Sequence, residues 1–316
     1  WAVWDREYNP NSMPFASIND IIYAFIGFDK DTGNLASLDG NADSWSIPVV
    51  SKAILQNPYM HAHLSFGGWT NNQVNTAPMF LKLSSSQASM QNFATQAVAL
   101  MKKTKFSGLD IDWEWWSEPE QAPAKQMLSF YKILRAELDK AGATDGKHYT
   151  LTIAVNAGVD RVNAMQDPSN PNSVADYWKQ VNTLVDQINL MSYDYHGAYD
   201  NSKPAYFHAN YDFANIPLDK QADVGQTSGW SIKAVVAAYQ ANGITAKKLV
   251  LGLPAYARTM SVSGGTNGGL LQAVSGAGFG DYEAGVLDYK CLVNPVADKA
   301  NGCKNVSAGL SDLVFY

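Results

Sequence analysis

The sequence predicts an α/β protein, specifically a (β/α)8 TIM barrel with a small α+β insertion after its seventh strand. Apolar, β-rich segments alternate with segments of helical periodicity, a pattern typical of parallel βα units. The 316 residues fit one such barrel. The Gly-rich stretch after residue 258 is far longer than a βα loop of roughly 2–6 residues, so we expect it to form the insertion. An open doubly wound sheet also fits the alternation.

Seven segments are expected to form parallel strands. The first, Trp1–Trp4, has the composition of the end of a strand, which indicates a processed or trimmed chain. The other six are 21–26, 60–66, 106–112, 149–155, 188–193 and 249–254. Residues 313–316 either begin an eighth strand or end the insertion, and in the second case the given chain lacks the strand that closes the barrel. The expected division is therefore a barrel over 1–258, an insertion over 259–312 and a candidate start of strand eight at 313–316.

Three helices are expected between these strands because apolar residues recur at i, i+3 and i+4. Their apolar faces lie within 90–101, 127–138 and 230–239. In the second of them the face consists of Met127, Phe130, Tyr131, Leu134 and Leu138.

The composition excludes several classes of protein. The chain is 46% hydrophobic and 12% aromatic, which excludes a disordered or fibrous protein. Its net charge is −6, so the basic surface that tracks nucleic-acid phosphates is absent. No apolar run approaches the 18 or so residues that a membrane-spanning helix needs. Charged residues make up only 16%, and a polar surface of low charge suits contact with neutral polymers.

Some local patterns allow two interpretations or none that is specific. Cys291 and Cys303 either close one loop in an oxidising compartment or are two unrelated buried thiols. His61 and His63 share a strand face, but no third ligand is identifiable, so we expect barrel-interior histidines and no metal. The Gly-rich run 264–269 lacks the Lys-Ser/Thr of a phosphate-binding loop and is expected to form turns.

The most informative segment runs from Phe106 to Glu114, where Leu109, Ile111 and Trp113 alternate with Asp110, Asp112 and Glu114. On a strand, a period of two places the three carboxyl groups on one face, with Cα atoms roughly 6.6 Å apart at each step. In a parallel barrel this face points into the lumen, at the C-terminal mouth.

Stacked carboxyl groups in a partly dry site cannot all ionise cheaply, so the pKa of at least one is raised. A carboxyl group that stays protonated near neutral pH is what a general acid requires. The alternatives are a site for an oxygen-preferring cation or a solvated acidic edge. We favour catalysis, because buried acids without compensation cost several kcal/mol and seldom persist without a role.

At these residues the chain resembles glycoside hydrolase family 18, the chitinase family, whose fourth barrel strand carries DGxDxDxE. Residues 107–114 match that signature except at Ser107, which replaces the first Asp, and Trp115-Trp116 replace the usual Tyr-Pro. Further matches occur in the family's order. They are Tyr23-Ala24-Phe25 for YAF, Ser65–Trp69 for SxGGW, Met191–Asp194 for MxYD, and Gly252–Arg258 for GxPxYGR with Ala257 in place of Gly.

The resemblance implies substrate-assisted retention, in which the N-acetyl oxygen of the sugar attacks the anomeric carbon. Glu114 is then the general acid and base, Asp112 holds the acetamido N–H, Asp110 tunes the charge of Asp112, and Tyr193 hydrogen-bonds the acetamido carbonyl. Further substrate contacts are expected at Asp194, Met191, Trp69, Arg258, Tyr256, Tyr199 and Phe25. Trp69 is expected to be a sugar platform, whereas Trp113 points to the outer layer of the barrel.

The resemblance therefore implies a secreted, monomeric chitinase that acts on chitin or chito-oligosaccharides without a cofactor. Neither nucleic acid nor a membrane is expected as a partner. Two alternatives remain: an endo-β-N-acetylglucosaminidase that acts on glycoprotein glycans, and a catalytically silent chitinase-like lectin. The presence of Glu114 argues against the lectin, because silent relatives typically lose the acid.

Overall fold

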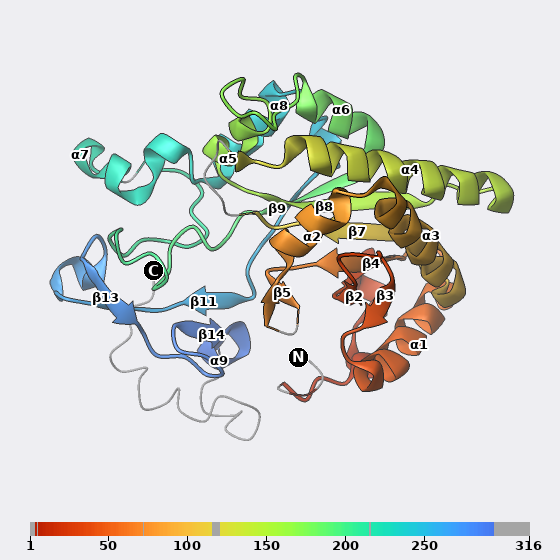
Figure 1. Cartoon of the computed structure of the whole chain (residues 1–316). Helices are drawn as coiled ribbons and strands as arrows, with labels where there is room; N and C mark the ends of the chain where they lie inside the picture. The colour runs from red at the N-terminus through yellow and green to blue at the C-terminus, as the bar shows by residue number, and fades with distance from the viewer. Residues whose placement is uncertain (1–3, 5, 72, 116–120, 215, 294–316) are drawn as a thin grey trace.

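A curved parallel sheet forms the centre of the computed structural model, which describes residue 4 and residues 6–71, 73–115, 121–214 and 216–293 (Figure 1). Its order is β1-β4-β7-β8-β9-β10, and each neighbouring pair is parallel. The strands are β1 Asp20–Tyr23, β4 His61–Gly67, β7 Gly108–Asp112, β8 Thr150–Asn156, β9 Gln187–Met191 and β10 Leu249–Leu251. Six of the seven expected strands are therefore confirmed. Of the first, only Trp4 is described, and it lies in a turn.

The expected strand at 21–26 is shorter than predicted. β1 ends at Tyr23, and Ile26–Phe28 forms a separate strand, β2, that pairs antiparallel with β3, Leu35–Ser37. The connecting turn explains the pairing, because the Asp29 carboxylate accepts hydrogen bonds from the backbone and hydroxyl of Thr32, each at 2.7 Å. A second short hairpin, β5 (Thr70–Asn71) with β6 (Val74–Asn75), follows β4.

Helices follow most of the strands of the sheet, as expected for βα units, and Figure 1 shows α3, α4, α6 and α8 along one side of it. The helices are α1 Gly40–Gln56, α2 Thr76–Ser84, α3 Gln87–Thr104, α4 Ala124–Asp145, α5 Val159–Ala164, α6 Tyr177–Leu184, α7 Leu218–Gln221, α8 Ile232–Ala241 and α9 Tyr289–Val293. The faces predicted within 90–101 and 127–138 lie on α3 and α4. The third predicted helix begins two residues late, because Ser231 is its N-cap and accepts a hydrogen bond from the Ala234 amide at 3.3 Å.

The main core lies between the sheet and these helices. Aromatic rings from α2, α3 and α4 pack there on the side chains that β4 and β7 send outward. Its central rings are Phe66, Phe80, Phe93, Trp113 and Phe130. Each such buried side chain stabilises the fold by roughly 1.5–3 kcal/mol, so this layer fixes the position of β7.

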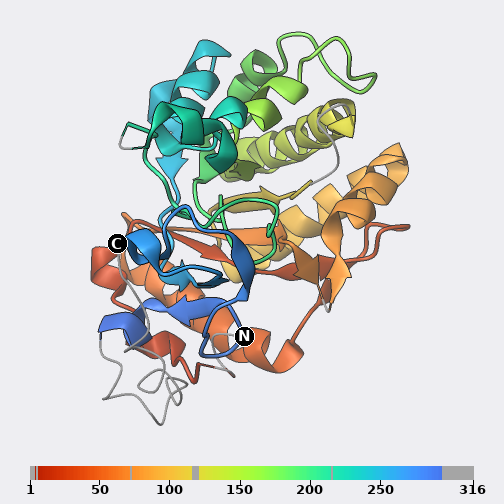
Figure 2. The same ribbon diagram turned by 90° about the vertical axis from the view of Figure 1, so that its left-hand side faces the viewer.

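The segment after β10 forms small strand pairs of its own. β11 (Tyr256–Arg258) pairs with β14 (Val286–Asp288), and β12 (Met260–Val262) pairs with β13 (Val274–Ala277). With α9 they form the group drawn in blue, which Figure 2 shows apart from the green and cyan helices. Whether this group is the expected insertion stays a prediction. The boundary at residue 258 stays a prediction, and residues 294–316, with the candidate eighth strand, lie outside the described residues.

Candidate active site

The acidic segment lies at the end of β7, and its predicted alternation is confirmed. Leu109 and Ile111 are fully buried and Trp113 is 2% exposed, so these three side chains pack under the helices. The Trp113 ring stacks on Phe80 with 4.9 Å between ring centroids. The alternate residues, with Asp110 first, therefore face the opposite side of the sheet. Trp113 is a core residue, as the sequence predicted.

Asp110 is held by polar side chains from three strands. Its carboxylate accepts hydrogen bonds from Ser65 on β4 at 2.7 Å, Thr152 on β8 at 2.5 Å and Asn189 on β9 at 3.4 Å. Burial raises the pKa of Asp110, although these hydrogen bonds oppose the shift. The neighbouring His63 is also buried, which lowers its pKa. Asp110 is thus fixed in position and surrounded by groups that can share its charge.

Asp112 differs from Asp110 in its surroundings. Its buried Oδ1 has no hydrogen-bond partner among the residues that the structure describes. Burial, together with the charges of Glu114 and Asp110, raises the pKa of Asp112 well above its usual value. The backbone holds the residue closely, because the Gly68 amide donates to the Asp112 carbonyl at 2.9 Å. A Cβ at Gly67 would lie 2.0 Å from that oxygen, so only glycine fits there.

Glu114 lies two residues beyond the end of β7, and Tyr193 lies two residues beyond the end of β9. The two groups meet at this edge: burial raises the pKa of Tyr193, and the charges of Asp112 and Glu114 add to the shift. The hydroxyl of Tyr193 therefore stays protonated beside the acids. A carboxyl group that ionises reluctantly (Asp112) lies near a neutral hydroxyl donor, an arrangement suited to binding a polar group and transferring a proton.

Asp194 forms the centre of a second cluster. Its carboxylate accepts hydrogen bonds from the Tyr256 hydroxyl at 2.7 Å and from Arg258 Nε and Nη2 at 2.9 and 2.6 Å, and His208 Nδ1 lies 3.4 Å away. Burial alone would raise the pKa of Asp194, but the hydrogen bonds from His208, Arg258 and Tyr256 lower it far below its usual range. The hydroxyl of Tyr199 donates to the Asp194 carbonyl at 2.5 Å. Four predicted site residues thus come together, and their direct contact with substrate stays a prediction.

The predicted apolar contacts lie around these two clusters. Trp69, just past β4, is 50% exposed, and Tyr199 is 60% exposed, so solvent reaches both side chains. The Phe25 ring lies against Gly68, where an added Cβ would come within 2.5 Å of it. Met191 is the last residue of β9. The exposure of Trp69 and Tyr199 is compatible with their expected role as sugar platforms, and the substrate contacts of all four residues stay predictions.

The structure places the two histidines differently and describes one of the two cysteines. His63 is buried and lies 2.7 Å from the Thr150 hydroxyl, which confirms an interior histidine, whereas His61 is exposed. No cluster of three or more His, Cys, Asp or Glu that could hold a metal occurs in the described part of the chain. Cys291 is fully buried and disulfide-bonded. Cys303, the chain's only other cysteine, lies outside the described residues.

Several residues around the site were missed by the sequence reasoning. Thr152 and Asn189 alternate with apolar residues in β8 and β9, a signal that could have placed them beside Asp110. Gly252 supports Tyr193, since a Cβ there would lie 2.5 Å from its ring. Asn156 and His208 carry no comparable signal, because they reach the site from a strand end and a loop.

Comparison with known proteins agrees with the resemblance. Chitinase 1 of Aphanocladium album is 30% identical over 340 residues, covering 100% of this chain and 73% of that protein. A solved chitinase from Bacillus thuringiensis superposes with a TM-score of 0.76 at 22% identity, over 92% of this chain and 54% of that one. A class V chitinase from Nicotiana tobaccum, solved with NAG4, gives 0.74 at 20% identity, over 94% and 77%. The (β/α)8 fold class is thereby confirmed. Residues 1–308 match the family described as glycosyl hydrolases family 18, and the chain belongs to that family.

Proposed function

We propose that this chain is a chitinase that hydrolyses β-1,4-linked N-acetylglucosamine polymers. The observation that carries the proposal is the largely buried Asp112 carboxylate, flanked by Asp110 and Glu114, with a side-chain oxygen that lacks a partner within the described residues. An acetamido N–H of the substrate would supply the missing donor. The names of the relatives support the same substrate, as Chitinase 1 of Aphanocladium album does over the full chain.

The reaction follows from the roles that the resemblance implies. Glu114 donates its proton to the glycosidic oxygen as the bond to the anomeric carbon breaks. The acetamido oxygen of the same sugar attacks that carbon, which forms an oxazolinium ion with net positive charge. Glu114, now ionised, then removes a proton from water as the water oxygen attacks the anomeric carbon. This attack opens the oxazolinium ring and gives a product with the anomeric configuration retained.

The electrostatics of the site favour the charged intermediate over the neutral substrate. As positive charge develops on the oxazolinium, the ionised form of Asp112 becomes favourable, so its raised pKa falls during the reaction. The hydroxyl of Tyr193, which burial keeps protonated, can donate to the acetamido carbonyl and hold it for attack. No carboxylate nucleophile from the protein is needed.

The test is time-resolved NMR of an N-acetylglucosamine hexamer with the wild-type chain and with Glu114→Gln. We expect fresh β-anomer product from the wild type alone, while Glu114→Gln still binds the oligosaccharide, because the amide keeps the shape but has no proton to give. Hydrolysis by Glu114→Gln at more than a few per cent of the wild-type rate would remove Glu114 from the acid role. α-Anomer as the first product would contradict retention.

The same experiment separates the alternatives. If both proteins bind the hexamer and neither cleaves it, the result favours the lectin. If the hexamer stays intact while a glycoprotein glycan is cut, the endo-β-N-acetylglucosaminidase is favoured. Glu114, the acid that silent relatives typically lose, is present in this chain, and so are Asp112 and Tyr193.

We also propose that the protein is secreted and monomeric. Chitin is an insoluble polymer that enzymes meet outside the cell, and a disulfide such as that of Cys291 persists in oxidising compartments. Among the described helices none is both long and apolar enough to cross a bilayer. Detection of the protein in culture medium and a sedimentation coefficient of a single 34.4 kDa chain would support both proposals.

A further inference from the structure

Glu114 lies just beyond β7, where strand pairing no longer holds the backbone. The registered pairs of β7 end at Asp112 on the β4 side and at Ile111 on the β8 side. The carboxyl group that transfers the proton thus stands two residues beyond the last registered pair. The residues on either side of Glu114, Trp113 and Trp115, set the course of the backbone from which its side chain extends.

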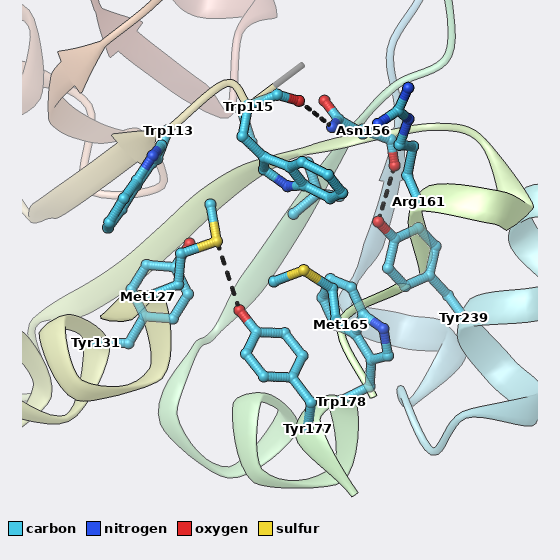
Figure 3. Close-up of a pocket in the computed structure, with 12 residues that line it drawn as sticks. Trp113, Trp115, Met127, Tyr131, Asn156, Arg161, Met165, Tyr177, Trp178 and Tyr239 are labelled. Carbon is cyan, nitrogen blue, oxygen red and sulfur yellow. Dashed lines mark hydrogen bonds between the residues drawn. The ribbon is translucent and has the colours of Figure 1, made fainter. Parts of the chain in front are cut away.

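The two tryptophans are anchored on different sides. Trp113 is fixed by stacking on Phe80 in the helical layer. Trp115 is 6% exposed and turns toward the end of β8, where Asn156 Nδ2 donates to its carbonyl at 3.0 Å. The Arg161 guanidinium carbon lies 5.2 Å from the centroid of the Trp115 ring, within the range of a cation–π contact (Figure 3).

The two groups that hold Trp115 are themselves supported. Asn156 is the last residue of β8, and its carbonyl accepts a hydrogen bond from the Tyr239 hydroxyl of α8 at 2.8 Å. Arg161 belongs to α5, and the adjacent Asp160 lies 3.7 Å from its Nε. The end of β8 and α5 therefore both contact Trp115, and α8 supports the end of β8, although Trp115 is 41 residues from Asn156 along the chain.

A small cavity lies beside the two tryptophans. A cavity of about 20 Å³, room for about one water molecule, is lined by Trp113 and Trp115 together with side chains of α4, α6 and α8 (Figure 3). Part of each ring thus faces space rather than a packed neighbour. The contacts from Asn156 and Arg161 therefore add to the packing that holds Trp115.

We propose that Asn156 and Arg161 are positioning residues for Glu114: they act through Trp115 to aim the carboxyl group at the glycosidic oxygen. This inference rests on the proposed function and adds to it two residues that never touch the substrate. A misplacement of about 1 Å at a reacting group can lower the rate on the order of 100-fold, so loosening Trp115 should act on kcat.

The test compares Asn156→Leu, which keeps the approximate shape but removes the donor, with Arg161→Met, which keeps an unbranched stem but removes the charge. We expect each to lower kcat on the hexamer by at least about 10-fold, with KM and the oligosaccharide Kd within about threefold of wild type. Arg161→Lys restores a cation and should recover most of the lost kcat. A purely structural role would lower Tm and the active fraction without this split.

The matched control is Lys147→Met. Lys147 makes a similar contact, 4.7 Å from the Tyr149 ring, just before β8 begins at the opposite end of that strand from Asn156. The variant Lys147→Met should leave kcat unchanged. If Asn156→Leu fails to fold, Arg161→Met carries the test, since it leaves the hydrogen bond in place. A kcat within about twofold of wild type in folded Arg161→Met would overturn the proposal.

Failure of the proposed function has a separate signature. If the wild type hydrolyses no N-acetylglucosamine oligosaccharide, crystal structures of the wild type and of Asn156→Leu decide the positioning role without activity. We then expect the Glu114 carboxyl group to shift by about 1 Å or to lose order in the variant. An unchanged Glu114 would contradict the inference.

Discussion

Gly252→Ala tests whether the active site depends on the placement of one ring. A Cβ built at Gly252 lies 2.5 Å from Cε1 of Tyr193 and 2.4 Å from the carbonyl oxygen of Leu190. Carbon atoms in ordinary contact are about 3.5–4.0 Å apart, so the ring must retreat by about 1 Å. The carbonyl belongs to β9 and cannot retreat as easily. We therefore expect a loss of stability of about 1–3 kcal/mol as well.

The expected kinetic effect follows from that displacement. Tyr193 is proposed to hold the acetamido carbonyl in position for attack, and an error of about 1 Å there costs on the order of 100-fold in kcat. This loss corresponds to about 2.7 kcal/mol in the activation barrier. The assay is steady-state hydrolysis of the N-acetylglucosamine hexamer at a temperature well below the Tm of the variant. Gly276→Ala is the matched control, because nothing lies within 4 Å of a Cβ at that position.

A double-mutant cycle with Tyr193→Phe shows whether the effect passes through the hydroxyl. By itself, Tyr193→Phe should lower kcat far more than it raises KM, because the hydroxyl acts mainly as the oxazolinium forms. If Gly252→Ala acts by displacing that hydroxyl, the double variant should be about as slow as Tyr193→Phe. Fully additive losses, or a folded Gly252→Ala with kcat within about twofold of wild type, would refute this reasoning.

Two further predictions concern pH and stability. Because burial and the neighbouring acids raise the pKa of Asp112 in the folded state, the stability of the wild type should fall as pH rises above about 4. Asp112→Asn removes the ionisable group, so it should abolish activity but have a higher Tm than the wild type at pH 7. Thermal melts should show this difference in Tm closing toward pH 4. A variant no more stable than wild type at pH 7 would argue against a strained acid. Because its partners lower the pKa of Asp194, this carboxylate stabilises the fold above about pH 4, and the stabilisation is lost as pH falls through the folded pKa. Arg258→Met should lower the free energy of unfolding by about 1–3 kcal/mol at pH 7 and by progressively less in acid. A loss independent of pH would contradict the ion pair.

Much of the barrel was predictable from local patterns. The alternation of Leu109, Ile111 and Trp113 with acids is a period-two signal, and the structure buries all three apolar residues because the helical layer covers that face. The helical faces of α3 and α4 were predictable for the same reason. Where a turn or cap decides the outcome, as at β1 and α8, the bounds shifted by two or three residues.

The supporting contacts of the site were beyond that reasoning. Asp194 and Arg258 are 64 residues apart, and Trp115 and Asn156 are 41 residues apart. Such pairs form because the strands of a parallel barrel bring their C-terminal ends together. Local periodicity gives the face of a side chain, but it does not give the register between strand ends or the course of the loops beyond them. The family resemblance named Asp194 and Arg258 individually, whereas their mutual hydrogen bonds required the structure.

Asp110 and Asp112 differ in how the protein satisfies their buried oxygens, and therefore in what each contributes to stability. Asp110 is satisfied by three hydrogen bonds, so its burial adds to a rigid floor for the site. Asp112 beside it is largely buried and has a side-chain oxygen, Oδ1, that none of the described residues satisfies, which costs stability in the free protein. In the proposed mechanism that cost is recovered when a donor and a positive charge arrive together, as they would in an oxazolinium ion. A site built for structure would satisfy both acids alike; the difference between them is therefore the strongest physical argument that this face of β7 evolved for catalysis.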